Sequence, residues 1–192
     1  YTYYHGSNSV TFVYPGSFSS PWDGYTKPTG DLVIPSTGTQ NSKVYNVVAV
    51  GYYAFMDCSE ITSVTIPRSI VSIGSSAFYD CIGIAIVNWN ADSCVLEYDI
   101  FGCSRGNSSN ITSINIGGSV SFLPGSAFYV CGNVATVNLS DSITSLTLGY
   151  WDVFPDNVTS PILNSKLFVH LPWGYPDTSY TIPDGLTTIC DY

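Results

Sequence analysis

The chain has 192 residues, enough for one domain with a buried core or for one array of repeats. Fourteen acidic residues against five basic ones give a net charge of -9, which repels phosphate backbones and argues against nucleic-acid binding. The longest apolar stretch, residues 47–55, is interrupted by Gly51 and is too short to cross a bilayer, so we expect no membrane insertion of this segment.

The first 31 residues are expected to form an N-terminal β-hairpin cap, because YTYYHGSNSVTFVYPG alternates around a turn-forming centre. Residues 32–192 are then assigned to a repeat array. Its first words are LVIP (32–35) and VVAVG (47–51), and a hairpin-like insertion, STGTQNSKVY, lies between them.

A repeat of 23 to 27 residues follows, and it recurs in several columns at once. An Ala-Phe-like pair, then a cysteine, then a short alternating strand recur in that order. Periods of 20 to 29 residues with one short strand per unit indicate a stacked solenoid. The phenylalanine column is Phe55, Phe78, Phe101, Phe128 and Phe154, and the strand words are ITSVTIP (61–67), IAIVNWN (84–90), ITSINIG (111–117) and VATVNLS (134–140).

The strand words predict one parallel sheet of about five coils, with alternate side chains turned inward. A second apolar element follows three of the strands, as in SIVSIG (69–74), but no sustained helical period is present, so turns and short 3₁₀ pieces should join the coils. The phenylalanine and cysteine columns form the far wall of the core. The inward residues are Val64, Ile66, Val87, Trp89, Ile114, Ile116, Val137 and Leu139.

These words resemble the BspA-type leucine-rich repeats of bacterial and protist surface proteins. The family motif runs roughly C-x-x-L-x-x-V-x-I-P, x-S-V-x-x-I-G, x-x-A-F, and residues 58–67, 69–74 and 77–78 match it closely. The resemblance covers residues 32–192 and fades at residues 88–99 and 157–166. It implies a leucine-rich-repeat solenoid of the α/β horseshoe class, display at the cell surface or outside the cell, and adhesion to host proteins, neighbouring cells or glycans.

Two functions are considered for this array. The first is a non-enzymatic adhesion or binding module on a cell surface. The second is a structural subunit whose open end docks head-to-tail on another copy, giving an extracellular filament or surface layer. The last repeat segment, TIPDGLTTICDY, stops before the next Ala-Phe pair would begin. Two explanations are open: the chain is a fragment of a longer array that continues beyond residue 192, or it is such a subunit. We favour the fragment.

The binding surface is expected on the solvent side of the sheet, where two columns of mostly short polar side chains lie side by side. A solvated sheet face without a partner is the competing interpretation. Aromatic residues at coil edges, such as Tyr52, Tyr53, Tyr150, Trp151, Trp173 and Tyr175, are either recognition residues or edge packing. The candidate ligand-binding residues are Ser63, Ile86, Ser113 and Thr136 in one column and Thr65, Asn88, Asn115 and Asn138 in the other.

Four N-x-S/T sequons, at Asn107, Asn110, Asn138 and Asn157, are candidate N-glycosylation sites. No catalytic constellation, cofactor motif or metal-ligand spacing is present, so we expect no enzyme activity, no cofactor and no metal. His5 and His170 are interpreted as surface or turn residues.

The six cysteines are interpreted mainly as free buried thiols. Cysteines one coil apart lie within bridging distance, but side chains in a column point in parallel, which disfavours a disulfide. Cys94 and Cys190 fall outside the column and either pair elsewhere or are reactive, and an extracellular location would favour some bridges. The column consists of Cys58, Cys81, Cys103 and Cys131.

Overall fold

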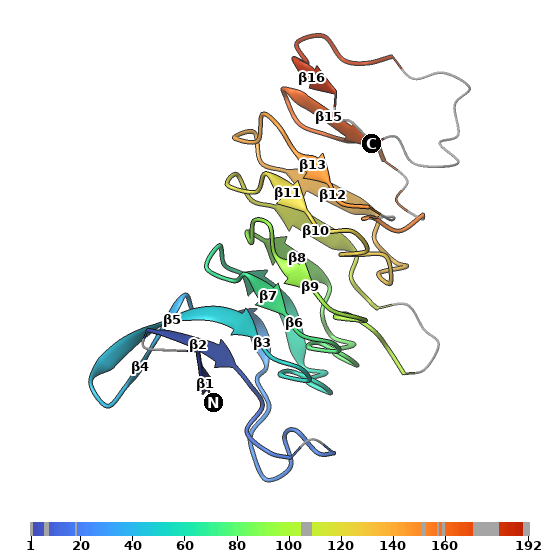
Figure 1. Ribbon diagram of the computed structural model, residues 1–192. Helices are drawn as coiled ribbons and strands as arrows, with labels where there is room; N and C mark the ends of the chain where they lie inside the picture. Colours follow the sequence, from blue (N-terminus) through green and yellow to red (C-terminus); the bar gives the residue numbers. More distant parts are fainter. Residues whose placement is uncertain are drawn as a thin grey trace.

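The computed structural model is a β-solenoid of five stacked coils that advance from the N-terminus to the C-terminus (Figure 1). It describes residues 2–5, 8–17, 19–104, 109–150, 153–156, 158, 160–170 and 181–189. None of these residues lies in a helix, so the helical segments of an α/β horseshoe are absent from this part of the chain. Most of the segments opposite the main sheet are strands of only two residues, such as β7 (Ser72–Ile73) and β11 (Phe122–Leu123), which is too short for a helix.

The main sheet, here called the front wall, contains one strand from each coil. The strands run parallel in the order β12–β10–β8–β6–β3, and their register pairs Val64 with Val87, then Ile114 and Val137. Six of the eight predicted inward residues are buried, whereas Val137 and Leu139 are only half-buried because β12 is the edge strand of this sheet. The strands are β3 (Gly30–Val33), β6 (Ile61–Ile66), β8 (Ile86–Trp89), β10 (Ser113–Ile116) and β12 (Thr136–Leu139).

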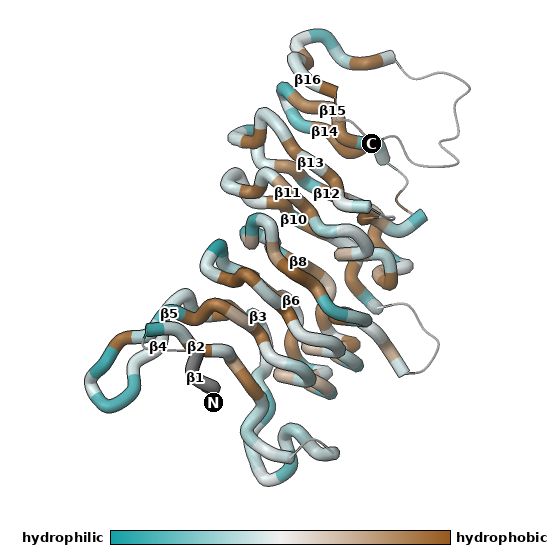
Figure 2. Tube along the Cα trace, viewed as in Figure 1, coloured by the Kyte–Doolittle hydropathy of each residue, from teal (hydrophilic) through white to brown (hydrophobic). Residues whose placement is uncertain are grey.

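The front wall is the predicted parallel sheet, but a second set of strands forms a back wall that was not predicted. Each apolar element that follows a front strand contributes a short back strand, and the core lies between the two walls. Figure 2 shows the hydrophobic residues along the strand segments and the hydrophilic residues at many of the turns between them. The back strands are β5 (Lys43–Val50), β7 (Ser72–Ile73) and β9 (Val95–Leu96) in one sheet, and β11 (Phe122–Leu123) and β13 (Thr147–Leu148) in another.

Two hairpins extend the first back sheet at its N-terminal end. β1 (Thr2–His5) pairs antiparallel with β2 (Ser9–Phe12), and β2 lies parallel to β5. The predicted insertion is a hairpin of β4 (Thr37–Gln40) and the start of β5. Its turn residues Asn41 and Ser42 have φ angles of 48° and 62°, as a two-residue type I′ turn requires.

The Ala-Phe pairs lie at the corner that follows each back strand, and their phenylalanines are in the core, as predicted. All five phenylalanines of the column are buried, and neighbouring rings stack with centroid distances of 5.1 Å (Phe55–Phe78) to 6.4 Å (Phe101–Phe128). The corner backbone of the first, second and fourth coils also bonds to the next coil, from Phe55 N to Ala77 O (2.7 Å), from Phe78 N to Ile100 O (2.8 Å) and from Phe128 N to Val153 O (3.0 Å). The corner therefore continues the hydrogen-bond ladder of the walls around the coil.

The last described strands form a separate three-stranded sheet. β14 (Ile162–Leu163) pairs antiparallel with β15 (Leu167–His170), and β15 pairs parallel with β16 (Thr188–Ile189). A search of the described residues for a helix long and apolar enough to span a membrane finds none.

Candidate binding surfaces

The eight predicted ligand-binding residues come together on the outer face of the front wall. The register places Ser63, Ile86, Ser113 and Thr136 in one row across four coils, and Thr65, Asn88, Asn115 and Asn138 in the next. All eight are exposed or half-buried. Because strand alternation turns these residues away from the core, the two columns form one continuous polar strip.

The asparagine column is bonded to itself. Asn115 Nδ2 donates to Asn88 Oδ1 (2.8 Å), and Asn138 Nδ2 donates to Asn115 Oδ1 (2.8 Å). Asn88 Nδ2 donates to Thr65 Oγ1 (3.2 Å), so the ladder spans four coils. These amides therefore stabilise the stack as well as forming the surface, a role that the sequence analysis missed.

A carboxylate stands at the N-terminal end of the strip. Asp31 of β3 lies beside Ser63 in the register, and its Oδ1 accepts hydrogen bonds from Ser63 Oγ (2.7 Å) and Thr62 Oγ1 (3.0 Å). These bonds, chiefly that from Ser63, lower the pKa of Asp31. The sequence could have predicted this position of Asp31, because aligning the segment DLVIP with SVTIP places Asp31 where SVTIP has Ser63.

Two of the sequon asparagines use the nitrogen that would carry a glycan. Asn110 Nδ2 donates to Ile82 O (2.7 Å), and Asn138 Nδ2 belongs to the asparagine ladder. Asn107 and Asn157 lie outside the described residues. Glycosylation of Asn110 or Asn138 would compete with an existing inter-coil contact.

The described cysteines are free thiols. Cys58, Cys81, Cys94 and Cys131 are buried and Cys103 is half-buried, while Cys190 lies outside the described residues. Burial raises the pKa of Cys58, Cys94 and Cys131 to about 12 and raises that of Cys81 as well. Cys94 therefore packs in the core as a small hydrophobe, and its burial favours the protonated thiol, the weaker nucleophile.

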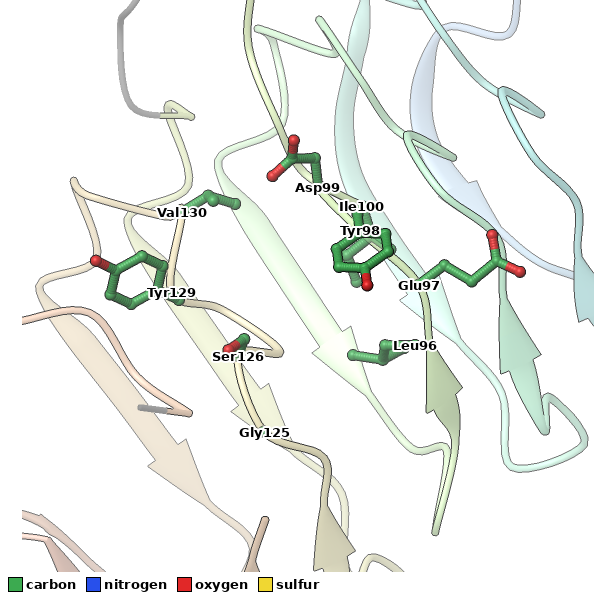
Figure 3. Close-up of a pocket in the computed structure, with 9 residues that line it drawn as sticks. All are labelled: Leu96, Glu97, Tyr98, Asp99, Ile100, Gly125, Ser126, Tyr129 and Val130. Carbon is green, nitrogen blue, oxygen red and sulfur yellow. The ribbon is translucent and has the colours of Figure 1, made fainter. Parts of the chain in front are cut away.

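A second surface is a hollow between coils three and four, at the corner that follows the back strands, with a volume of about 480 Å³. Tyr98 is 84% exposed on one wall of this hollow, and Tyr129 is 55% exposed on the other (Figure 3). The carboxylate of Glu97 points away from Tyr129 and accepts hydrogen bonds from Ser75 N and Oγ (2.9 Å each). We call this site the coil 3–4 hollow; it is lined by Leu96, Glu97, Tyr98, Asp99, Ile100, Gly125, Ser126, Tyr129 and Val130.

The predicted edge aromatics are divided between described and undescribed parts of the chain. Tyr52 and Tyr53 stack on each other with a centroid distance of 3.9 Å, and their hydrogen bond is the main cause of a raised pKa at Tyr52. Tyr150 is exposed, whereas Trp151, Trp173 and Tyr175 lie outside the described residues. The sequence did not single out Tyr98 or Tyr129, because it gives no sign that they face each other across a hollow.

The described residues hold no grouping that suggests catalysis. His170 packs beside the ring of Phe154 at a centroid distance of 6.4 Å, and the side chain of His5 is outside the described part of the structure. No group of three His, Cys, Asp or Glu residues in the described chain is placed to hold a metal ion.

The stacked coils, inward apolar strands and Phe corners define a repeat solenoid. Residues 39–152 match six copies of the BspA type leucine rich repeat region, so the chain belongs to this family. A search of curated proteins finds no match.

Several solved structures are similar to the chain. They include a leucine rich cell surface protein from Faecalibacterium prausnitzii (22% identity, TM-score 0.42, 99% of this chain and 50% of that one). A leucine-rich repeat protein from Bacteroides capillosus matches at 19% identity and TM-score 0.42, over 72% of this chain and 92% of that one. The pneumococcal vaccine antigen PcpA matches at 17% identity and TM-score 0.43, over 98% of this chain and 43% of that one. The chain thus spans half the length of the first of these proteins.

Proposed function

We propose that the chain is a non-enzymatic binding module displayed at a cell surface, where its front wall recognises a protein or glycan on a host or neighbouring cell. The observation that carries this proposal is the in-register strip of eight outward residues on β6, β8, β10 and β12. A broad, shallow strip of hydroxyl and amide groups can hydrogen-bond a protein loop or a chain of sugars. Membership in the BspA-type family supports the surface location.

The best place to test the strip is Ile86, which is 39% exposed at its centre and takes no part in the asparagine ladder. We expect Ile86→Arg to weaken binding to the partner roughly tenfold or more, because a long charged side chain would block the strip. The measurement is binding of the purified chain to arrays of immobilised glycans and of extracellular-matrix proteins, followed by affinity determination for each positive spot.

Val71→Arg is the matched control, because Val71 is 54% exposed next to β7 on the back wall. It adds the same charge to the opposite side and should leave the affinity unchanged. Equal loss of binding in both variants, or no loss in Ile86→Arg, would rule out the front strip as the recognition surface.

Two further expectations stay predictions. One is head-to-tail assembly of the chain into a filament, and the other is a domain boundary at residue 31.

A further inference from the structure

The back wall is interrupted between β9 and β11, and one cause is a proline. In the other coils the residue after the back strand donates its N–H to the preceding coil, from Glu97 N to Ile73 O (3.1 Å) and from Gly149 N to Leu123 O (2.8 Å). The corresponding residue of the fourth coil is Pro124, which has no N–H. The ladder bond to Leu96 O therefore cannot form.

The second cause is the side chain of Asp92. Elsewhere the first residue of the back strand donates to the preceding coil, from Val95 N to Val71 O and from Thr147 N to Ser121 O (2.9 Å each). In the fourth coil the corresponding donor is Phe122 N, and it bonds to Asp92 Oδ1 (3.0 Å) instead of to the backbone of the third coil. Asp92 Oδ1 also accepts a hydrogen bond from Ser121 N (2.8 Å). Both ladder donors are thus lost, and β9 and β11 belong to different sheets.

The interruption leaves backbone polar groups of β9 without a strand partner on the side of the fourth coil. Val95 N and Glu97 N bond to the preceding coil, so the N–H and the carbonyl group of Leu96 both face the gap. Leu96 also lines the coil 3–4 hollow. Figure 3 shows Asp99 at one end of the coil 3–4 hollow, near Tyr98. The nine lining residues include two acids and no basic residue.

We propose that the coil 3–4 hollow binds the guanidinium group of an arginine presented by an extended segment of a partner protein. A guanidinium has five N–H donors and no acceptor, which suits a site lined by the Asp99 carboxylate and the Leu96 carbonyl group and by no basic residue. Its flat face stacks on aromatic rings, and Tyr98 and Tyr129 offer one on each wall. The net charge of -9 attracts a cationic partner. This site shares no residue with the front strip and does not depend on it.

The test is an NMR titration of the ¹⁵N-labelled chain with N-acetyl-arginine methylamide. We expect fast-exchange shifts centred on the amides of Tyr98, Asp99, Ser126 and Tyr129. The citrulline analogue has almost the same shape without the charge, and it should bind at least about tenfold more weakly. Equal binding by the citrulline or lysine analogue would overturn the guanidinium assignment. Shifts with methyl glycosides but none with arginine would replace it by a sugar site, and no shift with any probe would exclude the site.

Two variants locate the binding. Asp99→Asn removes the carboxylate and Tyr98→Ala removes one aromatic wall; both side chains are exposed, so the fold should persist, as the dispersion of the amide spectrum will verify. Each should weaken the arginine analogue at least threefold, whereas Asp184→Asn, an exposed acid in the last described segment, should not. Unchanged affinity in Asp99→Asn and Tyr98→Ala would refute the proposal. Ile86→Arg should leave this titration unaffected, so failure of the front strip and failure of the hollow are separable.

Discussion

Single carboxylates link successive coils of this solenoid. Asp92 accepts bonds from Ser121 and Phe122, Asp141 accepts from Ser165 N (3.1 Å), and Asp31 accepts from Thr62 and Ser63. Each acid bonds to groups about one coil further along the chain. With only five basic residues available, the chain uses neutral N–H and O–H donors where other proteins use ion pairs.

These carboxylates predict a loss of stability in acid. Hydrogen bonds to the charged form lower the pKa of Asp31, Asp92 and Asp141, chiefly from Ser63, Ser121 and Ser165 respectively. A depressed pKa contributes stability above the unfolded-state value of about 3.9, and that contribution disappears as the pH falls through the lower folded-state pKa. The melting temperature should therefore be insensitive to these groups between pH 5 and 8 and should fall below about pH 4.

Thermal denaturation at pH 7, 5, 4, 3 and 2 measures this effect. The triple variant with Asp31→Asn, Asp92→Asn and Asp141→Asn should melt lower at pH 7 and show a shallower decline in acid. A variant that declines as steeply as the natural chain would show that other carboxyl groups control acid unfolding.

At the scale of strands, the interruption between β9 and β11 predicts an irregular pattern of amide exchange. Val95 N and Glu97 N donate to the second coil, whereas Leu96 N faces the gap, where the described residues provide no strand partner. The amide of Leu96 should therefore exchange with solvent at least about a hundredfold faster than those of Val95 and Glu97.

Hydrogen–deuterium exchange followed by NMR resolves these three amides. Ile73 is the matched reference, because its strand, β7, is paired on both edges. Similar protection at Leu96 and Ile73 would mean that the back wall is closed in solution.

Much of this element-level structure could be predicted from the sequence, for a definite reason. Repeated words such as ITSVTIP and ITSINIG fix the alternation and the register, so the inward residues and the phenylalanine column were correct. The back wall was missed because two-residue strands such as β7 are too short to show alternation. The coil 3–4 hollow was missed although Pro124 stands where SIVSIG has Gly74, because the role of Asp92 becomes visible only when side chains are placed.

For the whole molecule, the interface between coils three and four lacks the back-wall strand pairing that joins the other coils. The Phe101–Phe128 centroid distance of 6.4 Å exceeds the 5.4 Å between Phe78 and Phe101, and the back wall adds no strand pairing there. The front wall, the bonds to Asp92 and the edge-on packing of Trp89 against Phe128 (centroid distance 5.4 Å) join the two halves. In a repeat protein, cooperativity depends on such nearest-neighbour contacts.

Asp92→Ala should therefore reduce the cooperativity of unfolding. We expect a broader urea transition, with an apparent m-value lower by roughly a third, because the two halves would unfold at different urea concentrations. Asp141→Ala is the matched control: it removes a similar bond nearer the C-terminal end and should shift the midpoint more than the slope. An unchanged m-value in Asp92→Ala would show that the front wall alone couples the halves.

Pro124 also affects the register in which a partner binds along the repeats. A periodic face looks nearly the same after a shift of one coil, so a ligand that reads only the front strip could settle in several equivalent registers. Pro124 breaks this translational symmetry once, between coils three and four. A partner that touches both the strip and the coil 3–4 hollow would bind in a single register, because the hollow occurs between one pair of coils and fixes which coils the partner contacts.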